Sequence, residues 1–153
     1  MDALDCLMSR RTIRRFTDEE VAEDDLQKML DAARFAPSWA NTQCVEWIRI
    51  DDVALRSALQ ECVPAGNPAR RAIVDAPLLL ALCAGRGRSG FYKGQEATAH
   101  GDWYMFDAGI ASQNLVLAAW GLGYGSVHVG LLDHGAAAEV LDLPESLSLV
   151  ELM

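Results

Sequence analysis

One apolar stretch, residues 103–120, constrains the fold of this chain more than any other part of the sequence. It contains no proline, and apolar residues occupy nearly every face of the helix that it would form. A helix without a wet face must be enclosed by other elements, so we expect it to be the central helix of the fold. Asp102 can cap its first turn, and Gly121, Gly123 and Gly125 can end it.

The glycines are followed by an alternating segment, residues 126–131, that is typical of a strand. A dinucleotide-binding fingerprint has the opposite order, in which a strand precedes the glycines and a helix follows, so that the pyrophosphate meets the helix N-terminus. We therefore interpret the three glycines as a helix stop and a tight turn. A strand rich in glycine also lets a flat ligand approach the backbone closely.

Length and composition indicate one domain over residues 1–153. The chain is 51% hydrophobic and 23% charged, which is ordinary for a globular protein with a buried core. No apolar run approaches the ~20 residues of a membrane span, and the first residues, MDALDCLMSRR, lack the pattern of a signal peptide, so we expect a cytoplasmic protein. The net charge of -9 argues against nucleic acids and anionic membranes as partners.

Cysteine and histidine spacing predicts neither a metal site nor a structural disulfide. The cysteines at 6, 44, 62 and 83 form no CxxC pair, and the three histidines form no HxxxH pair. Cys44 has no histidine paired with it in the sequence, so we interpret it as a small buried apolar residue rather than a nucleophile.

Four of the thirteen basic residues fall within one window, Arg10-Arg11-Thr12-Ile13-Arg14-Arg15. Guanidinium groups bind phosphate oxygens bidentately and a threonine hydroxyl adds a further donor, so the window suits an anionic group. The alternative is a solvated basic patch or a docking tail. From the window alone we favour the solvated patch slightly.

A loop over residues 36–43 follows a predicted helix and carries hydrogen-bonding groups around a large aromatic ring. Such a loop suits a polar heterocycle, and the alternative is an ordinary turn with Trp39 in the core. The candidate ligand residues in it are Pro37, Ser38, Trp39 and Asn41.

Two further loops are candidates for binding. Residues 64–68 hold Asn67 as a possible amide donor, with Arg70 and Arg71 close behind, and solvent exposure is an equally good interpretation of all three. The segment from Gly85 to Gly101 is long for a compact domain, which is typical of a lid, a binding loop or a partner contact, with disorder as the competing interpretation.

The remaining segments alternate between helical and strand patterns. The run over residues 77–84 is continuously apolar, as expected of a strand covered on both faces. We expect helices over residues 2–8, 23–36, 53–62 and 133–141, and strands over 44–50, 77–84 and 147–153.

Three blocks now stand out together: SRRTIRRF (9–16), APSWANTQ (36–43) and FDAGIASQNLVLAAWGLGYGSVHVG (106–130). In this order they make the chain similar to the nitroreductase family of flavin-dependent oxidoreductases. The resemblance implies an α+β sandwich, in which a mixed, mainly antiparallel sheet is flanked by helices around a buried central helix. It also implies FMN at the interface of a homodimer, and hydride transfer from NADH or NADPH to an electron-poor acceptor such as a nitroaromatic or quinone.

The resemblance also implies roles for residues at matching positions. Arg10 and Thr12 match phosphate ligands, with Arg11 between them. Arg14 matches a basic residue beside the flavin pyrimidine, where a cation favours the anionic reduced ring. Val129 and Gly130 match a strand whose backbone amides lie near the reactive nitrogen of the flavin.

Two further blocks match flavin contacts. The residues Pro37, Ser38, Trp39 and Asn41 match a loop that reaches the cofactor bound mainly by the other subunit. Asn67, with Arg70 or Arg71, matches a flavin-contacting pair. The flavin supplies the chemistry in this family, so no side chain is assigned as an obligate acid or base.

The chain departs from the family pattern in two places. After Gln43 it has Cys-Val-Glu-Trp where many members have Pro-Trp. Members normally continue with a Gly-Tyr-Pro segment and a late arginine or lysine that closes on the flavin phosphate, and neither follows Met153. We therefore expect a single domain that lacks this segment, either as a fragment or with an incomplete phosphate site. The alternatives are a flavin-binding protein with little turnover, and an acidic interaction module whose arginines dock an anionic partner.

Overall fold

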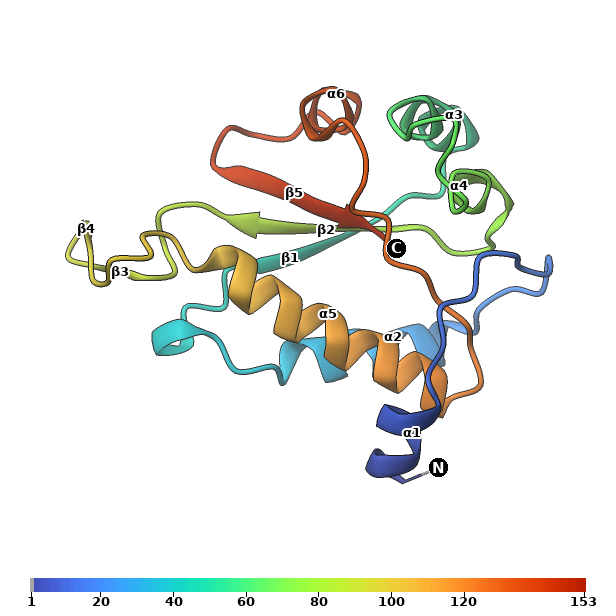
Figure 1. Cartoon of the computed structure of the whole chain (residues 1–153), viewed down its shortest axis with the longest axis horizontal. Coiled ribbons are helices and arrows are strands. Elements are labelled where there is room, and N and C mark those ends of the chain that lie inside the picture. Colours follow the sequence, from blue (N-terminus) through green and yellow to red (C-terminus); the bar gives the residue numbers. More distant parts are fainter. Residues whose placement is uncertain (1) are drawn as a thin grey trace.

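The computed structural model describes residues 2–153, which form three layers with a sheet between two groups of helices (Figure 1). The sheet contains β1 (Val45–Arg49), β2 (Leu80–Gly85) and β5 (Leu147–Leu152) in the order β1-β2-β5, and both neighbouring pairs are antiparallel. This arrangement agrees with the expected α+β sandwich.

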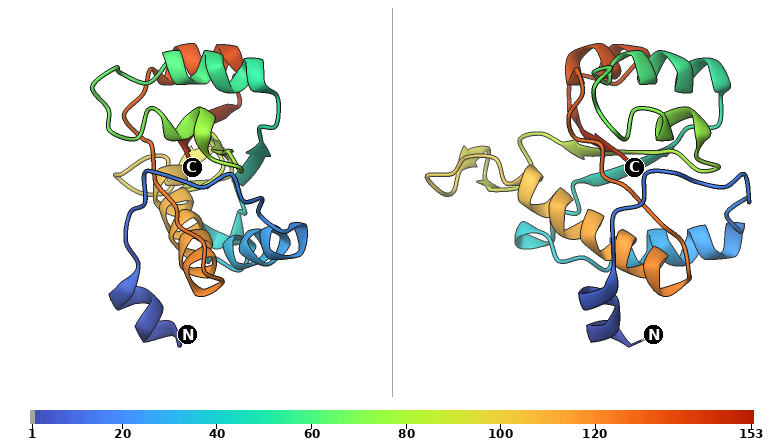
Figure 2. Two further views of the ribbon diagram at one scale, coloured as in Figure 1. Left: turned by 90° about the vertical axis from the view of Figure 1, so that its right-hand side faces the viewer. Right: turned by 45° about the vertical axis from the view of Figure 1, so that its right-hand side comes forward.

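Helices cover both faces of the sheet (Figures 1 and 2). One face carries α2 (Glu23–Arg34) and α5 (Tyr104–Gly121), and the other carries α3 (Val53–Glu61), α4 (Ala72–Asp75) and α6 (His134–Val140). The peripheral elements are α1 (Ala3–Ser9) beside α5, the short helix η1 (Trp39–Asn41) before β1, and the hairpin of β3 (Phe91–Tyr92) and β4 (Gln95–Glu96). None of the helices in the described part of the chain is long and apolar enough to cross a membrane.

The central strand β2 is covered on both faces, as its continuous apolar sequence predicts. All six of its residues are buried. Ala81 and Cys83 pack into the core beneath α3, α4 and α6, whereas Leu80 and Leu82 belong to the clusters on the side of α2 and α5. The alternation of side chains across a strand explains how one apolar run joins both cores.

The central helix α5 is enclosed on one side only, which corrects the expectation of a helix without a wet face. Ala111 and Leu115 are buried on the side that faces α2 and the sheet. On another side Met105 and Phe106 remain 55% and 60% exposed, and Gly109 is also exposed. Within this chain α2 and the sheet cover one side of α5, so part of the apolar surface of the helix is exposed to solvent.

Residues 126–131 were expected to form a strand, and the structure shows an extended segment held by two isolated bridges instead. One bridge joins Ser126 to Thr12 in parallel, and the other joins Val129 to Leu152 in antiparallel. Thr12 and Leu152 lie in different parts of the chain, so the segment forms no continuous ladder of hydrogen bonds with either of them.

The predicted long loop from Gly85 to Gly101 contains the β3–β4 hairpin, which projects from one end of the molecule (Figure 1). The Trp103 amide donates to the carbonyl oxygen of Ser89 at 3.0 Å, and its indole Nε1 donates to Thr98 Oγ1 at 2.8 Å. These contacts anchor the base of the projecting hairpin.

Candidate functional site

The arginine window and the segment 126–130 lie side by side although they are far apart in the sequence. The Ile13 amide donates to the carbonyl oxygen of Ser126 at 2.9 Å, beside the bridge from Thr12. Gly125 permits this approach, because a Cβ atom there would lie only 2.7 Å from Cγ1 of Ile13. The fold therefore unites two of the blocks that predicted a cofactor site.

The arginines of this window carry uncompensated positive charge. Arg10 is half-buried at the end of α1, and Arg11, Arg14 and Arg15 are exposed. The Arg11 guanidinium donates to the carbonyl oxygens of Met8 and Arg10 at 3.0 and 2.9 Å. No ion pair within residues 2–153 includes any of these four arginines. A cluster of unpaired guanidinium groups in a chain of net charge -9 suits a phosphate.

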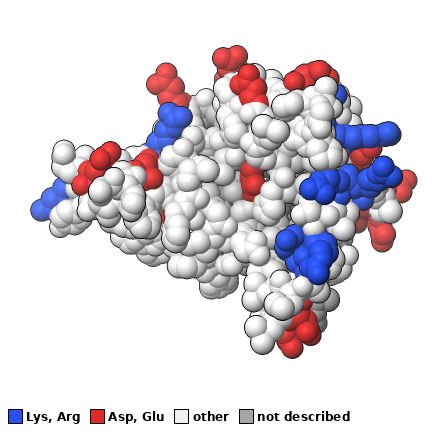
Figure 3. Space-filling model, viewed as in Figure 1, with Lys and Arg blue, Asp and Glu red and all other residues white. Residues whose placement is uncertain are grey.

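Basic side chains also gather on one side of the molecular surface. Figure 3 shows them on the right of the face seen in Figure 1, where the chain leaves α1. Acidic groups are scattered over the whole face, and a few further basic groups lie at its left end and upper left. An approaching anion would therefore be attracted to this side of the molecule.

Gly130 lies in the same extended segment as Ser126 and presents open backbone. No atom lies within 4 Å of the position that a Cβ atom would take there. The Val129 amide donates to the carbonyl oxygen of Leu152 at 2.8 Å, so this amide is not free for a ligand. The Gly130 amide has no hydrogen-bond acceptor in the described chain, which makes it the available donor of the predicted pair.

Asn67 contacts the backbone next to Gly130, whereas its arginine neighbours form ion pairs elsewhere. The Asn67 side chain donates from Nδ2 to the carbonyl oxygen of Leu131 at 3.3 Å and accepts at Oδ1 from the Ala69 amide at 2.9 Å. Arg70 pairs with Glu61 at 2.6 Å. Arg71 pairs with Asp75 of its own helix, also at 2.6 Å. These ion pairs hold the guanidinium groups of Arg70 and Arg71 on other residues, so Asn67 alone of the three contacts the backbone beside Gly130.

The loop of Pro37, Ser38, Trp39 and Asn41 is held in place by a buried carboxylate. The Trp39 amide donates to Oδ1 of Asp107 at 3.0 Å, and the Gln43 amide donates to Ser38 Oγ at 3.0 Å. The loop contains three residues other than glycine at positive φ: Ala40 (46°), Asn41 (54°) and Gln43 (48°). Such conformations persist only where surrounding contacts determine them.

This loop lies at the opposite end of α5 from the arginine window. Asp107, near the start of α5, holds the loop, whereas Trp120 near its end donates to Ser9 Oγ beside Arg10 at 2.9 Å. Thirteen residues of α-helix separate the two positions, which corresponds to about 20 Å. Within one chain the structure therefore does not bring this loop to the arginine window.

Cys44 is fully buried, as expected for a small apolar residue. Burial raises the pKa of its thiol, and the nearby Asp107 raises it further. The thiolate that a nucleophile requires is thereby disfavoured. All four cysteines are free thiols.

Several residues of interest were not singled out from the sequence. Asp107 is the only charged residue in 103–120, and a lone carboxylate on an apolar helix signals a buried acceptor that needs donors. His128 and Glu151 meet next to Gly130 through tertiary contacts, which local sequence patterns do not reveal.

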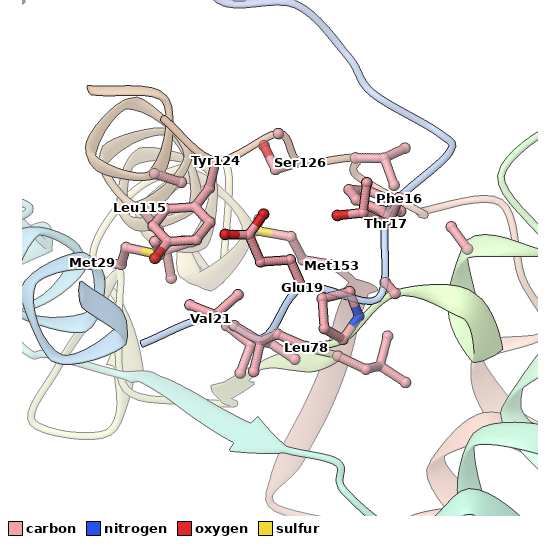
Figure 4. Close-up of a pocket in the computed structure, with 18 of the residues that line it drawn as sticks. Phe16, Thr17, Glu19, Val21, Met29, Leu78, Leu115, Tyr124, Ser126 and Met153 are labelled. Carbon is pink, nitrogen blue, oxygen red and sulfur yellow. The ribbon is translucent and has the colours of Figure 1, made fainter. Parts of the chain in front are cut away.

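A cavity of about 360 Å³ lies between α2, α5 and the chain leading into β2, and Ser126, Val127 and Val129 also line it (Figure 4). Its walls are largely apolar and include Met29, Leu115 and Met153. The Glu19 side chain lies across it toward Tyr124. The lining contains none of the four arginines of the window, and the carboxylate of Glu19 would repel an anion, so this cavity does not suit a phosphate.

Known proteins match this chain along most of its length. The sequence model described as "Nitroreductase family" matches residues 7–72 and 65–153. A putative NADH dehydrogenase/NAD(P)H nitroreductase of Methanothermobacter thermautotrophicus is 33% identical over 86% of this chain and 62% of its own length. The FMN reductase of Bacillus subtilis is 31% identical over 94% of this chain and 59% of its own length. The chain thus spans about three fifths of these two relatives.

Solved structures give the same result. A nitroreductase family protein from Clostridium novyi NT has a TM-score of 0.87 and 26% identity over 99% of this chain and 82% of that one. A putative nitroreductase from Desulfovibrio desulfuricans, solved in complex with FMN, has a TM-score of 0.77 and 27% identity over 97% of this chain and 81% of that one. The fold, the juxtaposed blocks and the match over both halves of the sequence show that this chain belongs to the nitroreductase family.

Proposed function

We propose that this chain is an FMN-dependent oxidoreductase, which passes electrons from NADH or NADPH through bound flavin to an electron-poor acceptor such as a nitroaromatic or quinone. The observation that carries the proposal is the unpaired arginine window bridged at Thr12 to Ser126, in the same extended segment as the open backbone of Gly130. Guanidinium groups bind phosphate oxygens. No atom lies within 4 Å of a Cβ placed at Gly130, so there is room for a flat ring over its backbone. The FMN reductase name of the Bacillus subtilis relative and the FMN complex of the Desulfovibrio desulfuricans protein support the same cofactor.

Each residue of the site has a distinct task in this proposal. Arg10, Arg11 and Thr12 hold the phosphate, and Arg14 lies beside the pyrimidine edge. Gly130 offers its free amide to the ring, and Asn67 keeps the neighbouring backbone in place through its bond to Leu131. FMN, when bound, supplies the hydride-transfer chemistry, while these residues bind and orient it and exclude water.

We further propose a homodimer in which the loop of Pro37, Ser38, Trp39 and Asn41 completes the partner's site. Two observations support it. The loop lies about 20 Å from the arginine window of its own chain, so a single chain leaves the site incomplete. Large apolar side chains are also exposed on α1 and α5: Leu4, Leu7, Met8, Met105 and Phe106. Exposed apolar surface on adjoining elements is typical of an interaction face.

We also propose that residues 1–153 form a single domain, that the protein is cytoplasmic, and that its electron acceptor is a small molecule. The single domain is supported by the one sheet that the helices on both sides share. The net charge of -9 supports a small-molecule acceptor rather than nucleic acid or an anionic membrane as partner.

The visible spectrum of the protein tests the proposal. The full chain is incubated with excess FMN, separated from free cofactor and scanned, then mixed with NADH or NADPH without oxygen, and finally with a quinone. We expect retained flavin absorbance, bleaching by the nicotinamide and recovery with the quinone. A colourless protein would contradict cofactor binding. Retained flavin that no nicotinamide bleaches would identify a flavin-binding protein without turnover.

A further inference from the structure

Ser112 of α5, His128 and Glu151 of β5 form a hydrogen-bonded cluster. Ser112 Oγ donates to Glu151 Oε1 at 2.5 Å. His128 Nδ1 lies 3.0 and 3.1 Å from the two carboxylate oxygens of Glu151, and 3.3 Å from Ser112 Oγ. Ser112 is 4% exposed, and the side chains of Glu151 and His128 are 12% and 37% exposed. A largely buried carboxylate thus holds a partly exposed imidazole.

The contacts determine which nitrogen of the imidazole faces outward. An ionised carboxylate only accepts hydrogen bonds, so Nδ1 of His128 carries the hydrogen that points to Glu151. Nε2 then has no hydrogen-bond partner in residues 2–153. Glu151 fixes the ring orientation and stabilises the positive charge that develops when Nε2 takes up a proton. His128 is therefore arranged to exchange a proton at Nε2.

The cluster is not arranged for nucleophilic catalysis. A serine nucleophile donates to a histidine base that a carboxylate orients through its other nitrogen. Here the Ser112 hydroxyl donates to Glu151 and is buried. Ser112 and Glu151 therefore act on the orientation of the imidazole.

The cluster borders the open backbone of Gly130. The antiparallel bridge between Val129 and Leu152 places Gly130 opposite Glu151. Side chains alternate along extended chain, so His128 lies on the same side as Gly130, while Val129 is buried on the other. Two residues of extended backbone correspond to about 7 Å. A ring over Gly130 and an acceptor stacked on that ring would both lie within reach of the imidazole.

We propose that His128 is the catalytic residue that supplies the proton accompanying reduction of the acceptor, with Ser112 and Glu151 as positioning residues. This inference rests on the proposed function. Reduction of a quinone to a quinol requires two electrons and two protons. FMN, when bound and reduced, would supply a hydride, which carries two electrons and one proton. His128 in its protonated form, with hydrogens on both ring nitrogens, gives the second proton from Nε2 to the developing oxyanion. The ring is left neutral with its hydrogen on Nδ1, and Nε2 then takes up a proton from solvent.

Loss of His128 should affect the two half-reactions differently. Hydride transfer from the nicotinamide to the cofactor takes no proton from His128, whereas reduction of the acceptor does. General acid catalysis contributes about 10²-fold or more to a rate. His128→Gln should therefore slow reoxidation by a quinone by about 10²-fold, while flavin reduction by NADH and FMN affinity stay at wild-type values.

Rapid-mixing absorbance measurements on the FMN-loaded full chain test this split, with His134→Gln as the matched control. His134 also contacts β5, through Nε2 and the carbonyl oxygen of Val150 at 3.2 Å, and has no part in the cluster. We expect both half-reactions of His134→Gln to match the wild type. Reoxidation of His128→Gln at the wild-type rate would overturn the inference. Equal slowing of both half-reactions would also overturn it, because a residue that merely shapes the ring site affects both.

A second measurement is independent of activity. In chain labelled with ¹⁵N-histidine, the imidazole nitrogens of His128 should report the Nδ1–H tautomer at a pH where the ring is neutral, and Glu151→Ala should convert it to the Nε2–H form. Glu151→Ala should also slow reoxidation more than reduction. An Nε2–H tautomer in the wild type would overturn the arrangement. A wild-type chain that retains no flavin would instead contradict the proposed function, and this inference with it.

Discussion

The backbone amide of Trp39 donates a hydrogen bond to the buried Oδ1 of Asp107 at 3.0 Å, which joins the loop before β1 to the start of α5. The other oxygen of Asp107 accepts from Ser89 Oγ at 2.5 Å and from the Cys44 thiol at 3.6 Å. One side chain therefore joins α5 to two other parts of the chain, the segment from Trp39 to Cys44 and the segment at Ser89. It also stabilises a loop with three non-glycine residues at positive φ.

Asp107→Ala should destabilise the protein more than Ser89→Ala. The first substitution leaves the partly buried amide of Trp39 and the buried hydroxyl of Ser89 without an acceptor, at about 1–3 kcal/mol for each. The second retains the bond to Trp39. Urea denaturation should therefore show a loss on the order of 2–5 kcal/mol for Asp107→Ala and a smaller loss for Ser89→Ala. Equal losses would show that the loop does not depend on this carboxylate.

Arg10→Ala and Arg14→Ala should differ in their effects on FMN. Loss of a charge-assisted phosphate bond at Arg10 costs roughly 1.5–3 kcal/mol, which raises the dissociation constant by about one to two decades with little change in potential. Arg14 beside the ring should also act on redox behaviour, so Arg14→Ala should lower the flavin potential as well. Fluorescence titration and spectroelectrochemistry measure the two quantities. Arg15→Ala is the control, and full affinity and potential in all three variants would indicate a solvated patch.

Gly125→Ala should separate the arginine window from the segment 126–130. The added Cβ would lie 2.7 Å from Cγ1 and 2.8 Å from Cβ of Ile13, so one of the two segments must move. We expect a lower unfolding temperature and weaker FMN binding. A variant with wild-type stability would show that this close approach is not needed.

Gly130→Ala should weaken FMN binding without destabilising the fold. A Cβ at Gly130 meets no atom within 4 Å, so the folded chain accommodates it, but it fills the space assigned to the ring. Gly66→Ala is the matched control, because a Cβ there also meets no atom within 4 Å. Thermal unfolding and FMN titration check both variants. Unchanged FMN affinity in Gly130→Ala would show that the flavin ring does not bind over Gly130.

Phe106→Glu should convert the proposed dimer into a folded monomer. Phe106 is among the exposed apolar residues of α5, and a carboxylate buried in an apolar interface without a partner is strongly unfavourable. Light scattering at micromolar concentration measures the mass, and circular dichroism measures the fold. Val53→Glu, at an exposed apolar residue on the opposite helical layer, should remain dimeric. A monomeric wild type would contradict the proposed assembly.

Stability should fall between pH 9 and 11 because of Cys83. Burial, with a smaller effect of Glu46, raises the pKa of this thiol from 9.0 to about 11. Within this window the unfolded chain releases the proton that the folded chain retains, so rising pH favours unfolding. The unfolding free energy, measured by urea denaturation at several pH values, should fall less steeply in Cys83→Ala. Identical slopes would show that this thiol does not contribute.

Much of the fold could be predicted from the sequence because its signals are local. The run at 77–84 indicated a strand covered on both faces, and β2 is buried along its whole length. The stretch 103–120 indicated the long helix α5, and its bounds differ by one residue at each end. Hydrophobic periodicity, proline and glycine act over a few residues, so they determine where such elements begin and end.

Local patterns were less informative where chain segments pair at a distance. Residues 126–131 alternate like a strand, yet their hydrogen bonds go to Ile13 on one side and Leu152 on the other. Asn67, Arg70 and Arg71 were equivalent candidates in the sequence, and only contacts with Glu61, Asp75 and Leu131 distinguished them. Each of these outcomes depends on where the rest of the chain places a partner.

The sequence by itself indicated most of the helices and strands, the buried strand β2 and the set of residues that resembles a flavin site. Only the tertiary structure decided which of these residues meet. It joined the arginine window at Thr12 to Ser126, left the loop at Trp39 at the far end of α5, and assembled Ser112, His128 and Glu151 into one cluster. The physical reason is that secondary structure follows from interactions between near neighbours, whereas a site depends on the packing of segments that only the complete fold brings together.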